Sequence, residues 1–135
     1  MPLAPLLDLA PLRDARGSLV AIESERSVPF AIRRVYYLYD WKEARGAHAH
    51  RELVQVYICV SGRCTVTLDD GRSREKVSLA DPGQGLLIGR MIWRELNDFS
   101  QDCVLLVLAS DHFAEEDYIR DHDDFVAAVA EARNG

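Results

Sequence analysis

The stretch that decides the fold runs from residue 53 to residue 71 and reads LVQVYICVSGRCTVTLDDG. It holds two apolar runs, Leu53 to Val60 and Arg63 to Leu68, separated by the turn dipeptide Ser61-Gly62. Asp70-Gly71 follows the second run and favours the tight turn of a β-hairpin. Short apolar runs bounded by turn residues predict strands of an antiparallel structure.

Similar short runs occupy much of the remaining chain. They cover residues 18–22, 32–39, 76–79, 85–88, 92–96 and 103–109. Many short strands at this spacing indicate an antiparallel sandwich or barrel. The C-terminus alone is helical in pattern, with Phe125, Val126 and Val129 at helical spacing after Asp121. We therefore expect an all-β fold with a short C-terminal helix.

Size and charge exclude several classes of protein. The chain has 135 residues and a net charge of -6, which fits one domain over residues 1–135. The acidic balance argues against a nucleic-acid partner, which requires a basic face. No apolar run approaches the roughly 20 residues that span a bilayer, and Met1 to Leu12 lacks the features of a signal peptide. A cytoplasmic protein without a membrane partner is expected.

The cysteines suggest no disulfide framework. Cys59, Cys64 and Cys103 form an odd set without CxxC or CxxH spacing, so no zinc site is indicated either. We expect reduced thiols, with Cys59 and Cys103 acting as small buried apolar side chains in their strands.

The segment Arg45 to Gln55 contains the most informative pair, His48 and His50. Residues two apart in a strand point to the same side, so the two imidazoles project together. On the wall of a cavity they would suit metal binding or proton transfer, whereas on the outside they would be ordinary surface histidines.

The pair also lies in a pattern similar to the first cupin motif, in which a glutamate follows two histidines. Here Gln55 stands in place of the glutamate. Residues 89–97 resemble the second cupin motif, but Trp93 occupies the usual histidine position. An amide and an indole are poor metal ligands. The resemblance therefore favours a cupin-type antiparallel jelly-roll barrel without a metal, in which the histidines move protons.

Several longer stretches resemble one family, the nucleotide-sugar 3,4-ketoisomerases of the WxcM-like group. They are residues 16–23, 29–37, 45–50, 85–86, 93–96, 103–110 and 117–120. The likeness covers nearly the whole chain. It implies an enzyme of deoxyamino-sugar biosynthesis that converts dTDP-4-keto-6-deoxy-D-glucose into its 3-keto isomer. It further implies a cofactor-free reaction and a homodimer that exchanges N-terminal strands.

The resemblance also assigns roles to residues. His48 is the expected base at C3, and His50 holds or relays a proton at the sugar oxygens through a 3,4-enediol. The expected substrate-binding residues are Arg16, Arg34, Tyr36, Arg45, Gln55 and Arg94. Arg16 resembles members that form the galacto product and Arg94 those that form the gluco product; the stretch around Arg16 favours galacto.

Three other functions fit the same residues less well. A non-enzymatic nucleotide-sugar-binding cupin would have little need for two adjacent bases. A 3,5-epimerase acting on the same 4-keto sugar also uses a histidine in a jelly roll, but its motifs are missing from this sequence. A metal-dependent cupin oxygenase is disfavoured by Gln55 and Trp93.

Overall fold

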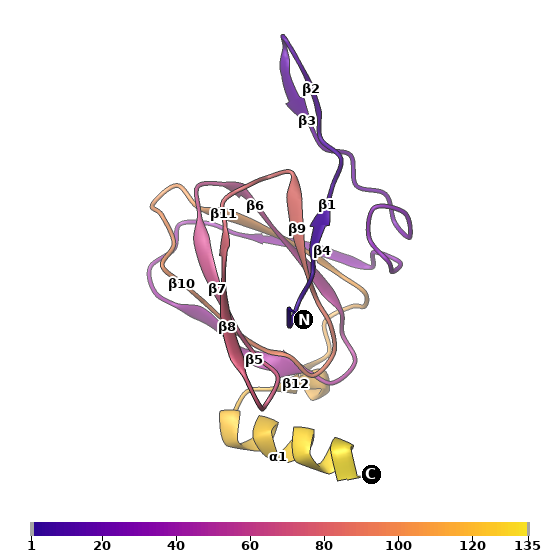
Figure 1. Cartoon of the computed structure of the whole chain (residues 1–135), viewed down its shortest axis with the longest axis vertical. Coiled ribbons are helices and arrows are strands. Elements are labelled where there is room, and N and C mark those ends of the chain that lie inside the picture. The colour runs from indigo at the N-terminus through magenta and orange to yellow at the C-terminus, as the bar shows by residue number, and fades with distance from the viewer. Residues whose placement is uncertain (1, 135) are drawn as a thin grey trace.

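The computed structural model describes residues 2–134, and these form twelve strands, a short 3-10 helix and one α-helix (Figure 1). Ten strands make two five-stranded antiparallel sheets. The first sheet has the order β1-β9-β6-β11-β4. In that order its strands are Leu6–Asp8, Gln84–Ile88, Gln55–Ser61, Val104–Ala109 and Arg34–Leu38.

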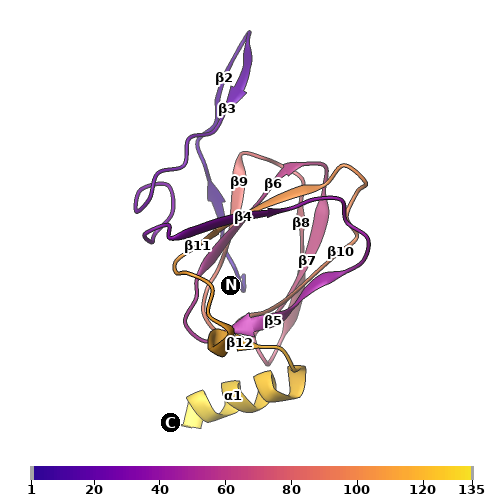
Figure 2. The same cartoon turned by 180° about the vertical axis from the view of Figure 1, so that it is seen from behind.

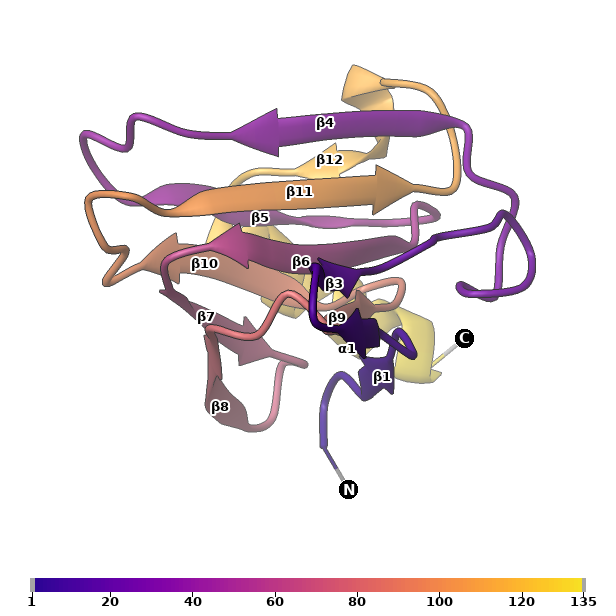
Figure 3. The same ribbon diagram turned by 90° about the horizontal axis from the view of Figure 1, so that it is seen from above.

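The second sheet faces the first across the barrel, as the view from above shows (Figure 3). Its order is β12-β5-β10-β7-β8. Its strands are Tyr118–Ile119, Arg45–His50, Trp93–Asn97, Cys64–Asp69 and Arg74–Leu79. The expected all-β antiparallel architecture is confirmed.

The turn signals in the opening stretch have two different outcomes. Asp70-Gly71 joins β7 to β8, which pair directly, and the Asp70 carboxylate accepts the amides of Arg72 and Ser73 at 2.8 and 2.9 Å. Ser61-Gly62 instead carries the chain from β6 in one sheet to β7 in the other. Gly62 has a φ of 67° there, a value that favours glycine.

Strand alternation supplies the core between the sheets. Leu86, Val66, Leu105 and Val107 are among the buried side chains there, each essentially without exposed surface. Residues with this alternation remove apolar area from water on one face of each strand, which is the main stabilising contribution to such a fold. The inner space is thus filled with apolar side chains except where the polar groups described below interrupt it.

The C-terminal helix α1, His122–Asn134, crosses one end of the barrel (Figures 1 and 2). It begins where expected, because the Asp121 carboxylate accepts the Asp124 amide at 3.0 Å as an N-cap. Phe125 and Val129 pack against Trp93 of β10. No helix among the described residues has the length and apolar character required to cross a membrane.

The N-terminal part differs from the sequence prediction. The run 18–22 forms a strand only at its start, in β3, Gly17–Leu19, which pairs with β2, Leu12–Asp14. This hairpin extends away from the end of the barrel opposite α1 (Figures 1 and 2). All six of its strand residues are exposed. Because neither β2 nor β3 has a buried face, their sequences carry no alternation of apolar and polar residues that would predict strands.

Candidate active site

A cavity of about 300 Å³ opens between the two sheets along the first part of β5. Strands β4, β5, β6, β10 and β12 all contribute to its wall. The lining residues are Arg34, Tyr36, Leu38, Arg45, Gly46, His48, Tyr57, Leu96, Tyr118 and Arg120. The wall therefore combines cationic, phenolic and imidazole groups with a few apolar ones, as expected for a site that binds a polar ligand.

His48 and His50 lie side by side on β5, as their spacing predicts. Their ring centroids are 4.9 Å apart with nearly perpendicular planes, and the Tyr118 ring lies 5.0 Å from His48 and 4.3 Å from His50. The Nε2 atom of each histidine is buried and has no hydrogen-bond partner among the described residues. Two imidazole nitrogens are therefore available to a ligand in the same small space.

Asp117 fixes the orientation of His50. Its Oδ2 lies 3.1 Å from His50 Nδ1, while its two oxygens also accept the backbone amides of Glu52 and Leu53 at 2.8 and 3.1 Å. A neutral His50 that donates Nδ1–H to this carboxylate keeps the Nε2 lone pair free. The contact orients a base, as in other carboxylate–histidine pairs.

Behind the cavity wall lies a buried chain of polar groups. The Arg94 Nη1 donates to Gln55 Oε1 at 2.6 Å, and Gln55 Nε2 donates to the Tyr36 hydroxyl at 3.1 Å. Two further Arg94 nitrogens donate to the Ile92 carbonyl. Arg94 is 0% exposed, and within residues 2–134 it forms no ion pair. A cation buried without an anion favours any negative charge that enters the neighbouring cavity.

This arrangement keeps both imidazoles neutral. Burial and the nearby Arg94 charge lower the pKa of His48 and of His50 to about 3, from an ordinary value of 6.5. The Asp117 contact is therefore a hydrogen bond from a neutral ring rather than an ion pair. Burial likewise raises the pKa of Tyr36 to about 12, so its phenol keeps its proton. The cavity offers bases and a proton donor in the forms that general acid–base chemistry requires.

The predicted site residues fall into three groups. Arg34, Tyr36, Arg45 and His48 line the cavity, and His50 adjoins it through His48. Gln55 and Arg94 lie buried behind the wall rather than on it.

Arg16 lies elsewhere. It belongs to the turn of the β2–β3 hairpin, where its guanidinium pairs with Asp14 at 2.7 Å and its side chain is 91% exposed. Within one chain, Arg16 does not reach the histidine pair.

Trp93, which stands at the histidine position of the second cupin motif, does not face the histidine pair. Trp93 points away from the cavity, into the layer beneath α1, where its ring is 5.7 Å from that of Phe125. The next residue, Arg94, pairs with His48 across β10 and β5 and points inward. Because successive strand residues point to opposite sides, an inward Arg94 requires an outward Trp93.

Sequence reasoning missed three residues of the site. Asp117 ends the 3-10 helix Glu115–Asp117, Tyr118 begins the two-residue strand β12, and Arg120 directly follows that strand. The Arg120 guanidinium lies 4.1 Å from the Tyr118 ring centroid and is held by Glu115 at 2.8 Å. The segment is too short for a periodic pattern. The sequence indicated it only through residues 117–120, one of the stretches that resemble the family.

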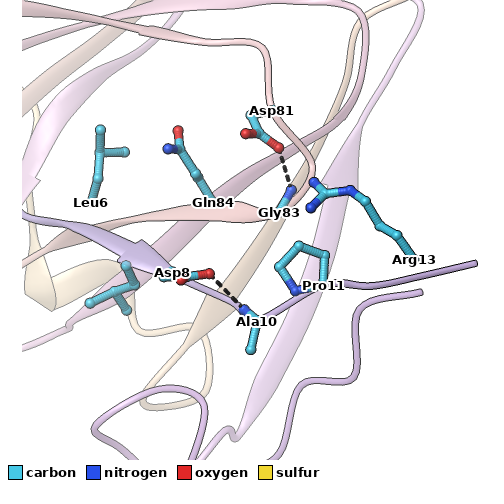
Figure 4. Close-up of a pocket in the computed structure, with 9 residues that line it drawn as sticks. Leu6, Asp8, Ala10, Pro11, Arg13, Asp81, Gly83 and Gln84 are labelled. Carbon is cyan, nitrogen blue, oxygen red and sulfur yellow. Dashed lines mark hydrogen bonds between the residues drawn. The ribbon is translucent and has the colours of Figure 1, made fainter. Parts of the chain in front are cut away.

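A second hollow lies beside β1, and its carboxylates are bound to backbone amides of nearby turns (Figure 4). The carboxylates of Asp8 and Asp81 point at the amides of Ala10 and Gly83, both at 2.8 Å. These side chains stabilise local turns instead of facing a ligand. The histidine cavity is therefore the better candidate for chemistry.

Antiparallel sheets with an inward histidine pair are typical of a cupin-like protein. The family described as FdtA, "WxcM-like, C-terminal", matches residues 4–130. The chain belongs to this family.

Three similar proteins are named as sugar 3,4-ketoisomerases or 3,4-oxoisomerases. A TDP-4-oxo-6-deoxy-alpha-D-glucose-3,4-oxoisomerase from Aneurinibacillus thermoaerophilus is 51% identical over 119 residues, covering 87% of this chain and 86% of the relative. The structure of WlaRB, a TDP-quinovose 3,4-ketoisomerase from Campylobacter jejuni, is 46% identical with a TM-score of 0.88, covering 94% of this chain and 99% of that one.

A third relative was solved with a sugar nucleotide. It is a histidine-to-asparagine mutant of the 3,4-ketoisomerase QdtA from Thermoanaerobacterium thermosaccharolyticum, in complex with TDP-4-keto-6-deoxyglucose. It is 37% identical with a TM-score of 0.93, covering 97% of this chain and 96% of that one. The chain is accordingly an enzyme of the sugar 3,4-ketoisomerase class, an intramolecular oxidoreductase.

Proposed function

We propose that the chain, as one cupin-like domain, converts dTDP-4-keto-6-deoxy-D-glucose into the dTDP-3-keto-6-deoxyhexose. The observation that carries the proposal is the pair of neighbouring, neutral imidazoles at the cavity, of which His48 lines the wall, with both Nε2 atoms buried and without a partner among the described residues. The activities named for the relatives supply the substrate class.

The chemistry needs only proton transfers. His48 removes the C3 proton next to the C4 carbonyl, and the electron pair of that C–H bond becomes the double bond of a 3,4-enediolate. A proton moves from the C3 hydroxyl to the C4 oxygen, with His50 as the relay, and a proton returned to C4 completes the 3-ketone. One carbon is oxidised and its neighbour reduced, so no external oxidant, metal or nicotinamide is required.

Arg94 and Tyr36 stabilise the enediolate intermediate. The enediolate carries negative charge on oxygen, and a fixed buried cation stabilises such charge strongly where water is excluded. Tyr36 is a neutral donor hydrogen-bonded to the same chain of groups. As charge develops on the sugar, the repulsion that keeps His48 neutral is offset, and proton transfer to His48 becomes favourable.

Arg34 is the proposed partner of the diphosphate. Its Nη1 is buried without a partner, and the guanidinium lies 4.5 Å from the Tyr36 ring centroid. Arginine can bind phosphate oxygens through two parallel hydrogen bonds. Arg45, exposed at the rim of the cavity, is positioned to assist.

The configuration at C4 of the product is the finer part of the proposal. The stretch that begins at Arg16 supports the galacto product. The inward position of Arg94 and the 46% identity to a TDP-quinovose enzyme, whose sugar has the gluco configuration, favour the gluco product as the second candidate. The coupling of the C4 proton to its neighbours, measured by NMR on the product, distinguishes the two.

A strand-exchanged homodimer of jelly-roll barrels would complete the site. The hairpin exposes Leu12 and Leu19, at 68% and 56%, and the outer face of β4 exposes Tyr37 at 62%. Exchange of N-terminal strands between two chains would cover these apolar surfaces and place Arg16 at the partner's cavity. Arg16→Ala is expected to raise KM about tenfold, without changing the fold of the barrel.

The decisive experiment combines purified protein with dTDP-4-keto-6-deoxyglucose and follows the sugar by NMR. We expect the 3-keto sugar with the native chain and at least a hundredfold slower turnover with His48→Asn. His112→Asn is the matched control, because this histidine is exposed and outside the histidine cavity. Near-native rates with His48→Asn would contradict the assigned base.

Binding and epimerisation are separate outcomes of the same assay. A sugar-binding cupin would leave the 4-keto sugar unchanged while still binding dTDP. A 3,5-epimerase would exchange the C5 proton with deuterated water and yield no 3-keto sugar. The cytoplasmic location stays a prediction from the sequence.

A further inference from the structure

Three thiols converge inside the barrel, although their spacing in the sequence gives no metal motif. Cys59 lies near the end of β6, Cys64 begins β7, and Cys103 directly precedes β11. Each is only 1% exposed, and none is part of a disulfide. Cys59 is four residues beyond Gln55 on the same strand, about 13 Å along it, so the cluster is separate from the histidine cavity.

The sulfur atoms are spaced as metal ligands. All three lie within 4.8 Å of one another, and the Cys59 and Cys103 sulfurs are 3.9 Å apart. An ion at the centre of three thiolate sulfurs, with bonds of about 2.3 Å, needs those sulfurs about 4.0 Å apart. The separation of the Cys59 and Cys103 sulfurs matches this geometry, and no pair of the three exceeds it by more than about 0.8 Å.

The surrounding turns hold the thiols in place. Ser100 accepts the Arg63 amide at 3.0 Å through its hydroxyl and donates its own amide to the Arg63 carbonyl at 2.9 Å, which joins the turn after β6 to the turn before β11. Trp41 donates to the Cys103 carbonyl at 3.0 Å, and its ring stacks on Phe99 at 4.6 Å. A site fixed by its supporting groups binds an ion without reorganisation.

We propose that Cys59, Cys64 and Cys103 form a buried binding site for one soft, thiophilic metal ion of the copper(I) type. Among the described residues no histidine or carboxylate atom joins the group, so all ligands are sulfur. Soft thiolates select copper(I) or zinc. Zinc prefers a fourth ligand in a tetrahedral site. Three sulfurs enclosed by apolar side chains therefore favour copper(I), which accepts three or fewer ligands.

Charge and access are both compatible with copper(I). The ion replaces thiol protons, which leave to water, and no electron is transferred. Two thiolates and one neutral thiol around copper(I) leave a single negative charge, which limits the cost of burial. The Cys59 thiol also touches the carbonyl of Ser61, at 3.2 Å, and Ser61 is exposed. This turn is therefore the proposed route by which the ion enters.

The test is an anaerobic titration of the reduced, metal-free protein with copper(I) held by a chromophoric chelator. We expect one copper per chain to leave the chelator, with thiolate-to-copper charge-transfer absorption in the ultraviolet. The chain has only three cysteines, so no other thiol can take the ion. Each of Cys59→Ala, Cys64→Ala and Cys103→Ala should weaken binding by about 100-fold or more, since even outer-shell changes cost 10- to 100-fold.

Val66→Ala is the matched control, because Val66 is 0% exposed in the same apolar cluster and carries no ligand atom. It should destabilise the barrel but keep the copper. No withdrawal of copper by the native chain, or full retention by the three cysteine variants, would overturn the proposal, and so would equal affinity for zinc(II). Ketoisomerase turnover of the metal-free chain tests the histidine cavity alone. The proposed function and the proposed copper site can therefore be refuted separately.

Discussion

Acidification should destabilise the folded chain through its two buried histidines. Both have a folded-state pKa of about 3, against 6.5 when exposed. Between these values the unfolded chain binds protons that the folded chain does not, so stability falls as the pH decreases. At pH 5.5 each histidine is almost fully protonated only in the unfolded chain, which lowers the free energy of unfolding by about 1.4 kcal/mol relative to pH 7.5. The pair therefore contributes about 3 kcal/mol.

Urea denaturation at pH 7.5 and 5.5, at one protein concentration and followed by tryptophan fluorescence, measures this difference. The double variant His48→Asn/His50→Asn should lose little stability over the same interval, and each single variant should lose about half as much as the native chain. This window lies above the range in which carboxylates titrate. An equal loss in the native chain and in the double variant would refute the assignment of buried neutral imidazoles.

Three further substitutions test other contacts. Asp117→Asn should lower kcat about tenfold or more with little change in KM, because His50 loses its orienting carboxylate; unchanged kcat would contradict that role. Burial and, after it, the Arg94 charge lower both histidine pKa values, so Arg94→Met should move the acid limb of the kcat/KM profile upward, part of the way toward pH 6.5; an acid limb at the native pH would contradict the role of Arg94. Gly62→Ala should cost about 1 kcal/mol or more in thermal unfolding because of its positive φ, whereas Gly89→Ala, in open space, should not.

The strands could be predicted because short apolar runs bounded by turn residues, such as those between Leu53 and Leu68, are typical of β-structure. The period of two along a strand places His48 and His50 on one side. The C-terminal helix was equally accessible, since Phe125 and Val129 recur at helical spacing and Asp121 caps the first turn.

Other parts of the site lacked such a signal. Both faces of β10 are buried, one in the barrel and one beneath α1, so hydrophobicity cannot tell whether Trp93 or Arg94 faces the histidines. Asp117 reaches His50 from a turn 67 residues away in sequence. The cysteines meet only because the end of β6 and the starts of β7 and β11 lie at the same corner, which depends on the sheet order rather than on local spacing.

The hairpin that stands apart from the barrel has a kinetic consequence. Arg16 and His48 lie on one chain, but in the proposed dimer they serve different cavities. Dilution below the dimer dissociation constant would then remove Arg16 from every cavity while each barrel stays folded. At substrate concentrations below KM, the rate per chain would then fall about tenfold on dilution, the change expected of Arg16→Ala, and would recover as the protein concentration rises and the chains pair.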